Sequence, residues 1–153
     1  MSAKPFALAM TGISVIKAAQ NLPQSATATL YTVSGGSVFV TGLLGLVSTS
    51  TGGVATNLSV GITGNNTAIV PAIAVASKTA PTWLVPQESA GSAATALLLS
   101  APVFLSNAFQ PFGSFVPFIC GPTIINWTTN ANDTGQMQWY LWYTPIDSGA
   151  SVS

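Results

Sequence analysis

The chain has 153 residues, enough to bury a hydrophobic core without metals or cross-links. It contains three Lys, three Asp or Glu, no Arg and no His, so charged residues make up 4% of the sequence, where about 25% is typical. This excludes a basic surface for nucleic acid, because binding to phosphates needs clustered Lys and Arg. So little charge also gives little like-charge repulsion between copies, and we therefore expect partners to cover much of the surface.

No metal site, cofactor or catalytic centre is expected. The single cysteine, Cys120, excludes an internal disulfide, and without His the usual zinc and Cys–His arrangements cannot form. We expect Cys120 to be a small buried apolar residue. The sequence also lacks the Walker loop, the Gly-x-Gly-x-x-Gly fingerprint and the Gly-x-Ser-x-Gly elbow. We therefore expect a protein that is not an enzyme.

The mean hydropathy of +0.55 requires that a membrane location be considered. The uncharged stretch from Ser89 to Phe109 is interrupted by Pro102, and only Ala96 to Leu99 is continuously apolar. A spanning helix needs about 20 predominantly apolar residues. The apolar N-terminal stretch does not match a signal peptide, because Lys17 lies where small residues should precede cleavage. We predict no membrane association.

Short alternating runs rich in β-branched residues, Gly and Pro recur along the whole chain. They predict an all-β fold, an antiparallel β-sandwich or jelly-roll-like single domain over residues 1–153. We expect an N-terminal arm at about 1–25 and a C-terminal tail at about 145–153, both of which can be extended.

The strongest hairpin pattern lies near the N-terminus. Thr29 to Val33 and Ser37 to Thr41 alternate, and a Gly pair after Ser34 separates them. Such a pair supplies the positive φ angles of a tight hairpin turn. Residues 42–47 extend the second strand, although their two glycines weaken it unless they mark a bulge or a close approach of another backbone.

The middle of the chain predicts further strands and turns. In residues 57–63, alternation points Leu58, Val60 and Ile62 toward the core. A turn is predicted at 64–67 and a strand at 69–76. Proline lacks the ladder donor, so loops or strand edges are expected at Pro71, Pro81, Pro86, Pro102, Pro111, Pro117 and Pro122.

One segment, Ala90 to Leu99, leaves two alternatives open. Its Ala and Leu residues favour a short helix, whereas Gly91 and the Ser and Thr content oppose one.

The strongest predicted strand is Gln136 to Thr144. Alternation places one set of side chains on each face: Met137, Trp139, Leu141 and Tyr143 on the first, and Gln136, Gln138, Tyr140 and Trp142 on the second. The core uses only one face of a half-buried strand. Tyr140 and Trp142 therefore lie either beneath a loop or at an interface, where Tyr and Trp are enriched. The candidate interface residues are Tyr140, Trp142, Trp127 and Trp83.

Asp133 and Asp147 are the two carboxylates that come closest to a catalytic hypothesis, a pair of the kind found in glycosidases. However, Asp133 lies in the sequence Asn-Asp-Thr-Gly and Asp147 in Pro-Ile-Asp-Ser-Gly. Both contexts are typical of turns, so we expect both residues to build turns.

Two regions of the chain resemble known structural proteins. The first is LPQS (residues 22–25) followed by LYTVSGGSVFVTGLLG (30–45), and the second is GPTI (121–124) followed by TGQMQWYLWYTPIDSGASV (134–152). Both are similar to the opening and closing motifs of small structural proteins of tailed bacteriophages, among them capsid decoration (cement) proteins. Leu46 and Gln138 stand where we would expect an acidic and a basic residue, which fits the low charge of this chain.

The resemblance implies a β-sandwich that forms a homotrimer and binds the major capsid protein. The protein would lie on the capsid surface of the virion, after assembly in the cytoplasm of the bacterial host. An alternative in the same particle is a tail, baseplate or head-fibre component. An alternative of another class is a glycan- or receptor-binding β-sandwich, in which exposed Trp side chains stack on sugar rings.

Overall fold

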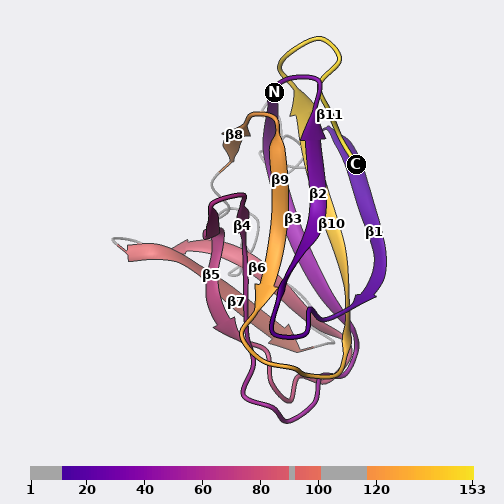
Figure 1. Ribbon diagram of the computed structural model, residues 1–153, viewed down its shortest axis with the longest axis vertical. Coiled ribbons are helices and arrows are strands. Elements are labelled where there is room, and N and C mark those ends of the chain that lie inside the picture. Colours follow the sequence, from indigo (N-terminus) through magenta and orange to yellow (C-terminus); the bar gives the residue numbers. More distant parts are fainter. Residues whose placement is uncertain (1–11, 90–91, 101–116) are drawn as a thin grey trace, which may run out of the picture.

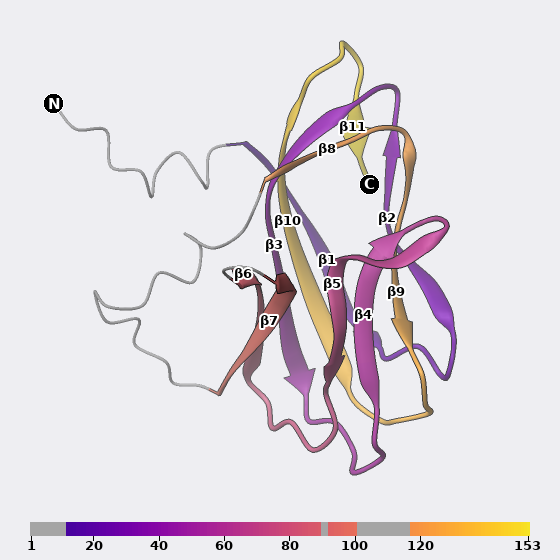
Figure 2. The same ribbon diagram turned by 90° about the vertical axis from the view of Figure 1, so that its left-hand side faces the viewer.

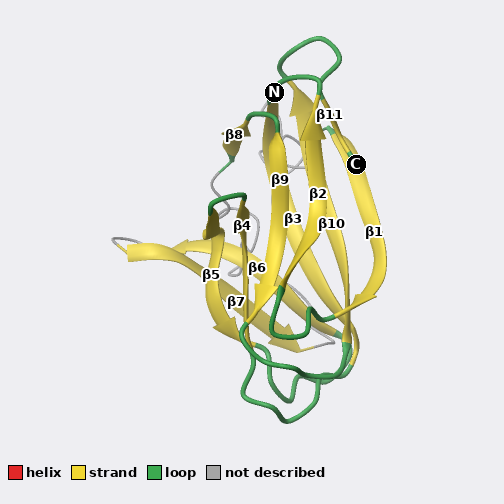
Figure 3. Ribbon diagram, viewed as in Figure 1, coloured by secondary structure: helices red, strands yellow, loops and turns green. Residues whose placement is uncertain are grey.

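The structure is a computed structural model that describes residues 12–89, 92–100 and 117–153. Two antiparallel β-sheets pack face to face, and the described residues contain no helix (Figure 1, Figure 3). This confirms the predicted all-β sandwich.

Sheet A has the strand order β1-β10-β3-β6-β7, and β8 also pairs with β3. The bounds are β1 Ile13–Asn21, β3 Val38–Thr49, β6 Thr82–Ser89, β7 Ser92–Ser100, β8 Phe118–Cys120 and β10 Gln136–Pro145. Sheet B has the order β11-β2-β9-β4-β5. Its strands are β2 Thr27–Ser34, β4 Asn57–Ile62, β5 Asn65–Ala74, β9 Thr123–Thr129 and β11 Ser151–Val152. Figure 2 shows β3 and β10 in one layer and β4 and β9 in the other.

Both predicted extensions contribute strands. From Ile13 onward, the predicted N-terminal arm is β1, an edge strand of sheet A that pairs with β10. In the predicted C-terminal tail, β11 pairs with β2, and Val152 is buried. These parts of the two segments therefore belong to the sandwich.

The predicted hairpin between β2 and β3 is wrong in its pairing. Gly35 and Gly36 do have positive φ angles of 73° and 142°, but β2 belongs to sheet B and β3 to sheet A. The turn carries the chain from one layer to the other, and Val33 and Val38 on its two sides are both buried in the core. Local alternation is the same for a hairpin and for such a crossover, so the sequence pattern could not separate them.

The helical alternative for 90–99 is wrong where the chain is described. Residues 92–100 form β7, which pairs with β6 from Thr82↔Ser100 to Ser89↔Ser92. Residues 90–91 lie outside the described part of the chain. Helix propensity is a weak preference, and the neighbouring strand overrides it by supplying backbone partners.

The two glycines of β3 make room for tryptophans on opposite sides of sheet A. A Cβ on Gly42 would lie 3.1 Å from the ring of Trp142, and a Cβ on Gly45 would lie 3.0 Å from the ring of Trp139. The register between β3 and β10 also shifts beside Trp142. Of the two alternatives, a bulge is present beside Gly42, whereas the groups that approach both glycines closely are side chains and not another backbone.

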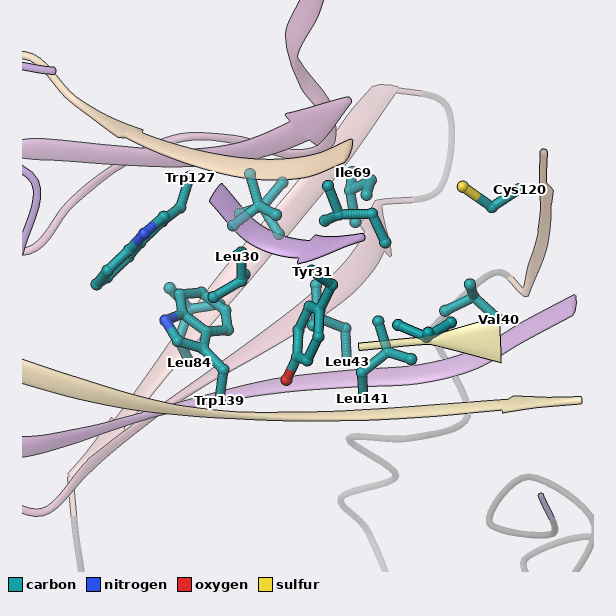
Figure 4. Close-up of a cluster of buried hydrophobic side chains, with 14 of the residues drawn as sticks. Leu30, Tyr31, Val40, Leu43, Ile69, Leu84, Cys120, Trp127, Trp139 and Leu141 are labelled. Atoms are coloured by element: carbon teal, nitrogen blue, oxygen red, sulfur yellow. The ribbon is translucent and has the colours of Figure 1, made fainter. Parts of the chain in front are cut away.

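The core lies between the sheets and is centred on Trp127 of β9 and Trp139 of β10 (Figure 4). Their rings meet edge to face, with centroids 5.8 Å apart and 83° between the planes. The predicted inward set of β10 is confirmed, because all four side chains are buried: Met137, Trp139, Leu141 and Tyr143. Leu58 and Val60 of β4 are fully buried as predicted, and Ile62 packs against the core.

Tyr31 is the most unusual polar residue of the core. The register between β2 and β9 shifts between Thr29 and Tyr31, and both Leu30 and Tyr31 are buried. The Tyr31 hydroxyl donates a hydrogen bond to the Val15 carbonyl over 3.3 Å, and the Lys17 amine lies 5.7 Å from the ring centroid. Burial raises the pKa of Tyr31 well above its usual range.

This pKa shift predicts a loss of stability in alkali. The unfolded chain loses the Tyr31 proton from about pH 10 upward, whereas the folded chain keeps it, so the free energy of unfolding falls as the pH rises above about 10. In Tyr31→Phe we expect the free energy of unfolding to fall less steeply above pH 10, measured by urea unfolding at a series of pH values. At pH 8 the free energy of unfolding of the variant should be only about 1 kcal/mol lower, because the variant lacks the hydrogen bond to the Val15 carbonyl. An equally steep alkaline loss in both proteins would show that another group causes it.

Candidate interaction face

The second set of β10 side chains lies on the outer side of sheet A, away from the core. Alternation places Tyr140 and Trp142 there, and both are half-buried. Trp83 of β6 joins them, with its ring centroid 5.8 Å from that of Tyr140. The Tyr140 and Trp142 rings are 6.3 Å apart, with 14° between their planes. Three of the four predicted interface residues therefore form one aromatic row across sheet A.

Aliphatic side chains extend this row. In the register of sheet A, Tyr140 lies between Ile16 of β1 and Leu44 of β3, and Leu46 of β3 lies beside Trp83. Ile16 is 57% exposed. We call the outer side of sheet A the aromatic face, and define it by Ile16, Leu46, Trp83, Tyr140 and Trp142, which are exposed or half-buried, and by Leu44, which is buried beside them.

A second pair of apolar side chains lies at one end of the aromatic face. Phe39 of β3 and Ile119 of β8 are opposite each other in the register. Val38 and Val40 on either side of Phe39 are buried in the core, so Phe39 points outward. Phe39 is 38% exposed and Ile119 is 69% exposed. The apolar surface of sheet A thus reaches β8.

The outer side of sheet B has the opposite character. Across β2, β9 and β4, Thr128 lies between Thr27 and Ser59, and Thr29 lies beside Asn126. The hydroxyl oxygens of Thr27 and Thr128 are 2.8 Å apart and share a hydrogen bond. We call this side the polar face, and define it by Thr27, Thr29, Thr32 and Thr128, which are exposed or half-buried, and by Ser59 and Asn126, which are buried. Ile124, 40% exposed, is a large apolar residue on the same side.

None of the charged side chains that the structure describes belongs to the aromatic face. The Lys17 amine is over the Tyr31 ring on the inner side of β1. Lys78 lies between β5 and β6, Asp133 precedes β10 and Asp147 follows it. The aromatic face as defined is uncharged, so its contacts with a partner must come mainly from apolar area.

The expectation that Trp127 is an interface residue is wrong. Trp127 is 1% exposed and packs on Trp139 in the core. Its strand has two adjacent apolar residues, Ile124 and Ile125, so alternation in the sequence did not indicate which side of β9 is buried. Trp127 therefore belongs to the core.

The sequence analysis missed the aliphatic part of the aromatic face. Leu44, Leu46 and Phe39 lie in a strand whose two sides are both apolar, the same signal that drew attention to β10. Ile16 and Ile119 stand out only because the fold brings β1 and β8 into sheet A. The outward apolar residues of β3 could therefore have been found from the sequence, whereas Ile16 and Ile119 could not.

The two aspartates lie at opposite ends of β10 and do not form a pair. Asp147 accepts a hydrogen bond from the Ser37 amide over 2.7 Å, and Asp133 accepts one from the Thr134 amide over 2.8 Å. A strand of this length separates them by about 30 Å. Their hydrogen bonds to backbone amides are those expected of residues that build turns.

The remaining chemical groups give no second candidate site. Cys120 is buried as predicted, and burial raises the pKa of its thiol. Within residues 12–89, 92–100 and 117–153, no group of three or more His, Cys, Asp or Glu side chains is placed to hold a metal ion. The same residues include no helix long and apolar enough to cross a membrane.

No protein-family model, no curated protein and no solved structure matches the chain. The contrast between the aromatic face and the polar face is therefore the feature that bears most directly on function.

Proposed function

We propose that this chain is a structural subunit of a tailed-bacteriophage virion, a capsid decoration protein without enzymatic activity that binds other proteins through its aromatic face. The observation that supports it is the difference between the two outer sides of the sandwich. One side carries Ser, Thr and Asn, while the other carries Trp83, Tyr140 and Trp142 among aliphatic residues. Contiguous apolar surface marks interaction sites on soluble proteins, and Trp and Tyr are enriched among interface anchors.

The position of the aromatic row also links the face to the resemblance with phage structural proteins. The resembling segments 30–45 and 134–152 include all of β10 and most of β3. Tyr140 and Trp142 come from the second segment, and Leu44 comes from the first. The segments that resemble decoration proteins thus supply three of the six residues that define the face, while Ile16, Leu46 and Trp83 come from other parts of the chain.

A capsid lattice is a suitable partner for an uncharged face. Binding through apolar area contributes about 25 cal/mol per Å² removed from water and needs no ion pairs. An uncharged face lacks long-range electrostatic steering, and this absence mainly lowers the rate of association. Many identical sites on one particle compensate for weak single contacts through avidity. The major capsid protein is therefore the partner that we propose for this face.

The test uses particles of the phage that encodes the chain, prepared without this protein and separated into heads and tails. We expect the purified protein to co-sediment with heads. Trp142→Ala should weaken this binding about 30-fold or more, as expected for an anchor worth at least about 2 kcal/mol. Thr128→Ala on the polar face is the matched control and should bind like the unchanged protein.

Each alternative has its own outcome. Binding to tails and not to heads would replace the decoration role with that of a tail or baseplate component. Equal binding by Trp142→Ala and Thr128→Ala would remove the aromatic face from the proposal. Binding to neither particle, together with specific binding in a glycan screen, would favour the glycan-binding alternative.

A further inference from the structure

The edge strands among the described residues differ in how well they are protected against pairing with another chain. Sheet A ends in β1 and β7, with the three-residue β8 as a further edge beside β3, and sheet B ends in β11 and β5. An edge presents unpaired backbone groups, which short strands, Pro and Lys normally shield. β11 has two residues and β5 contains Pro71. β1 and β7 each have nine residues and no Pro, but β7 lies close to β5 of the other sheet, which leaves β1 as the long edge without such a neighbour among the described strands.

The regular part of β1 is Ile13–Lys17, since the register with β10 shifts between Lys17 and Gln20. Among the described strands, this segment pairs with β10 alone. Its one charged residue, Lys17, holds its amine over the Tyr31 ring and not out at the edge. Ile13 is 49% exposed and Ile16 is 57% exposed. Within the described part of the chain, the segment therefore combines a backbone edge that has no strand partner with exposed apolar side chains.

We propose that the Ile13–Lys17 edge of β1 pairs with the same segment of a second copy of this chain. An antiparallel strand can pair with its own copy about a two-fold axis, because the contact surface is then self-complementary. An axis at Val15 places Ser14 opposite Ile16 and Lys17 opposite Ile13. The Lys17 residues of the two copies are then not opposite each other, which avoids the cost of like charges in directly opposed positions.

The charge of the chain favours a second copy over an unrelated protein. A typical protein has about 25% charged residues, and a charge buried against an apolar edge without a partner costs free energy. Ile13, Ser14, Val15 and Ile16 carry no charge, and Lys17 holds its amine over the Tyr31 ring of its own chain, so the same segment of another copy brings only this one charge, which already has a partner. The Val15 carbonyl already accepts the Tyr31 hydroxyl, but a carbonyl has a second lone pair for a further donor.

This pairing joins two copies of sheet A into one continuous sheet. The two-fold axis of an antiparallel edge contact is perpendicular to the sheet, so both aromatic faces lie on the same side, with Ile16 of each copy at the seam. The expected assembly is a dimer and not the trimer that the resemblance implies. The pairing rests on the edge of β1 alone, so it can fail while the proposed virion role holds.

Sedimentation equilibrium of the full chain tests this inference. A five-residue pairing is smaller than a standard interface, so we expect a weak dimer with a dissociation constant of about 10–100 µM. Ile16→Lys, which places a charge at the seam, should raise that constant about tenfold or more. Ile124→Lys is the matched control, because Ile124 is also an exposed isoleucine but lies on sheet B; it should leave the constant unchanged.

Hydrogen exchange provides a second measurement that does not depend on a variant. Amides within Ile13–Lys17 should gain protection as the protein concentration rises from about 1 µM to about 1 mM, while β5 amides should not. A chain that remains monomeric at about 1 mM, or one that forms only trimers, would overturn the inference. So would equal weakening by the two lysine variants, or protection that rises in β5 and not in β1.

Discussion

Trp139→Ala should lower the free energy of unfolding by about 3–5 kcal/mol, measured by urea unfolding at neutral pH. The Trp139 side chain is fully buried, packs edge to face on Trp127 and fills the space above Gly45. Alanine at this position leaves a cavity between the two sheets. The β-sheet backbone on both sides prevents that cavity from closing, so the loss should lie in the upper part of the range.

Trp142→Ala is the matched variant on the same strand. Trp142 is only half-buried and covers Gly42 on the outer side of sheet A. We expect it to lower the free energy of unfolding by no more than about 1–2 kcal/mol, while it weakens the binding to heads. Equal losses of stability in the two variants would contradict the assignment of the two faces of β10.

The sequence predicted strands well where alternation was unbroken. In β10 and β4, one side of the strand is apolar in every second position, and the structure buries that side. The prediction failed where long-range pairing decides the outcome. The Gly35-Gly36 turn is compatible with both a hairpin and a crossover, and the segment 92–100 becomes a strand only because β6 lies beside it.

The candidate site could be predicted in part for the same reason. Tyr140 and Trp142 follow from alternation along one strand, and the structure adds Trp83 to them by placing β6 next to β3. Trp127 was expected at the interface as a large aromatic residue, and only the packing of sheet B against sheet A shows that it faces inward.

β3 and β10 are each apolar on both sides, and this connects stability with the proposed interaction. Both strands are central in sheet A, and β3 pairs with β10, β6 and β8. Their inner side chains anchor the core and their outer side chains form the middle of the aromatic face. A partner bound to that face would contact the most firmly held strands of the sheet, so little ordering of the backbone would oppose binding.

Gly61→Ala should destabilise the β4–β5 hairpin by about 3 kcal/mol. Gly61 has no positive φ angle, so the cost comes from space and not from backbone conformation. A Cβ at this position would overlap the carbonyl oxygen of Asn65 and lie 2.6 Å from the Asn66 Cα. These are backbone atoms, which cannot rotate away as a side chain would.

The irregular pairing of β5 explains why its backbone passes so close to Gly61. Val60 pairs with Val70 and Ile62 pairs with Asn65, so four residues, 66–69, have no partner in the β4 register. Asn66 reaches across to the Thr27 hydroxyl on the polar face. An alanine side chain would lift this bulge from the sheet, and the amides of 65–70 should then exchange faster than in the unchanged protein.

Gly121→Ala is the control for this prediction. No atom lies within 4 Å of a Cβ at Gly121, and its φ angle is not positive. Alanine there also restricts the unfolded chain, so the free energy of unfolding should stay the same or rise by about 0.4–1 kcal/mol. A Gly61→Ala protein as stable as Gly121→Ala would show that the bulge can move away from β4, and that the close contact with Gly61 is not what fixes the register of β5.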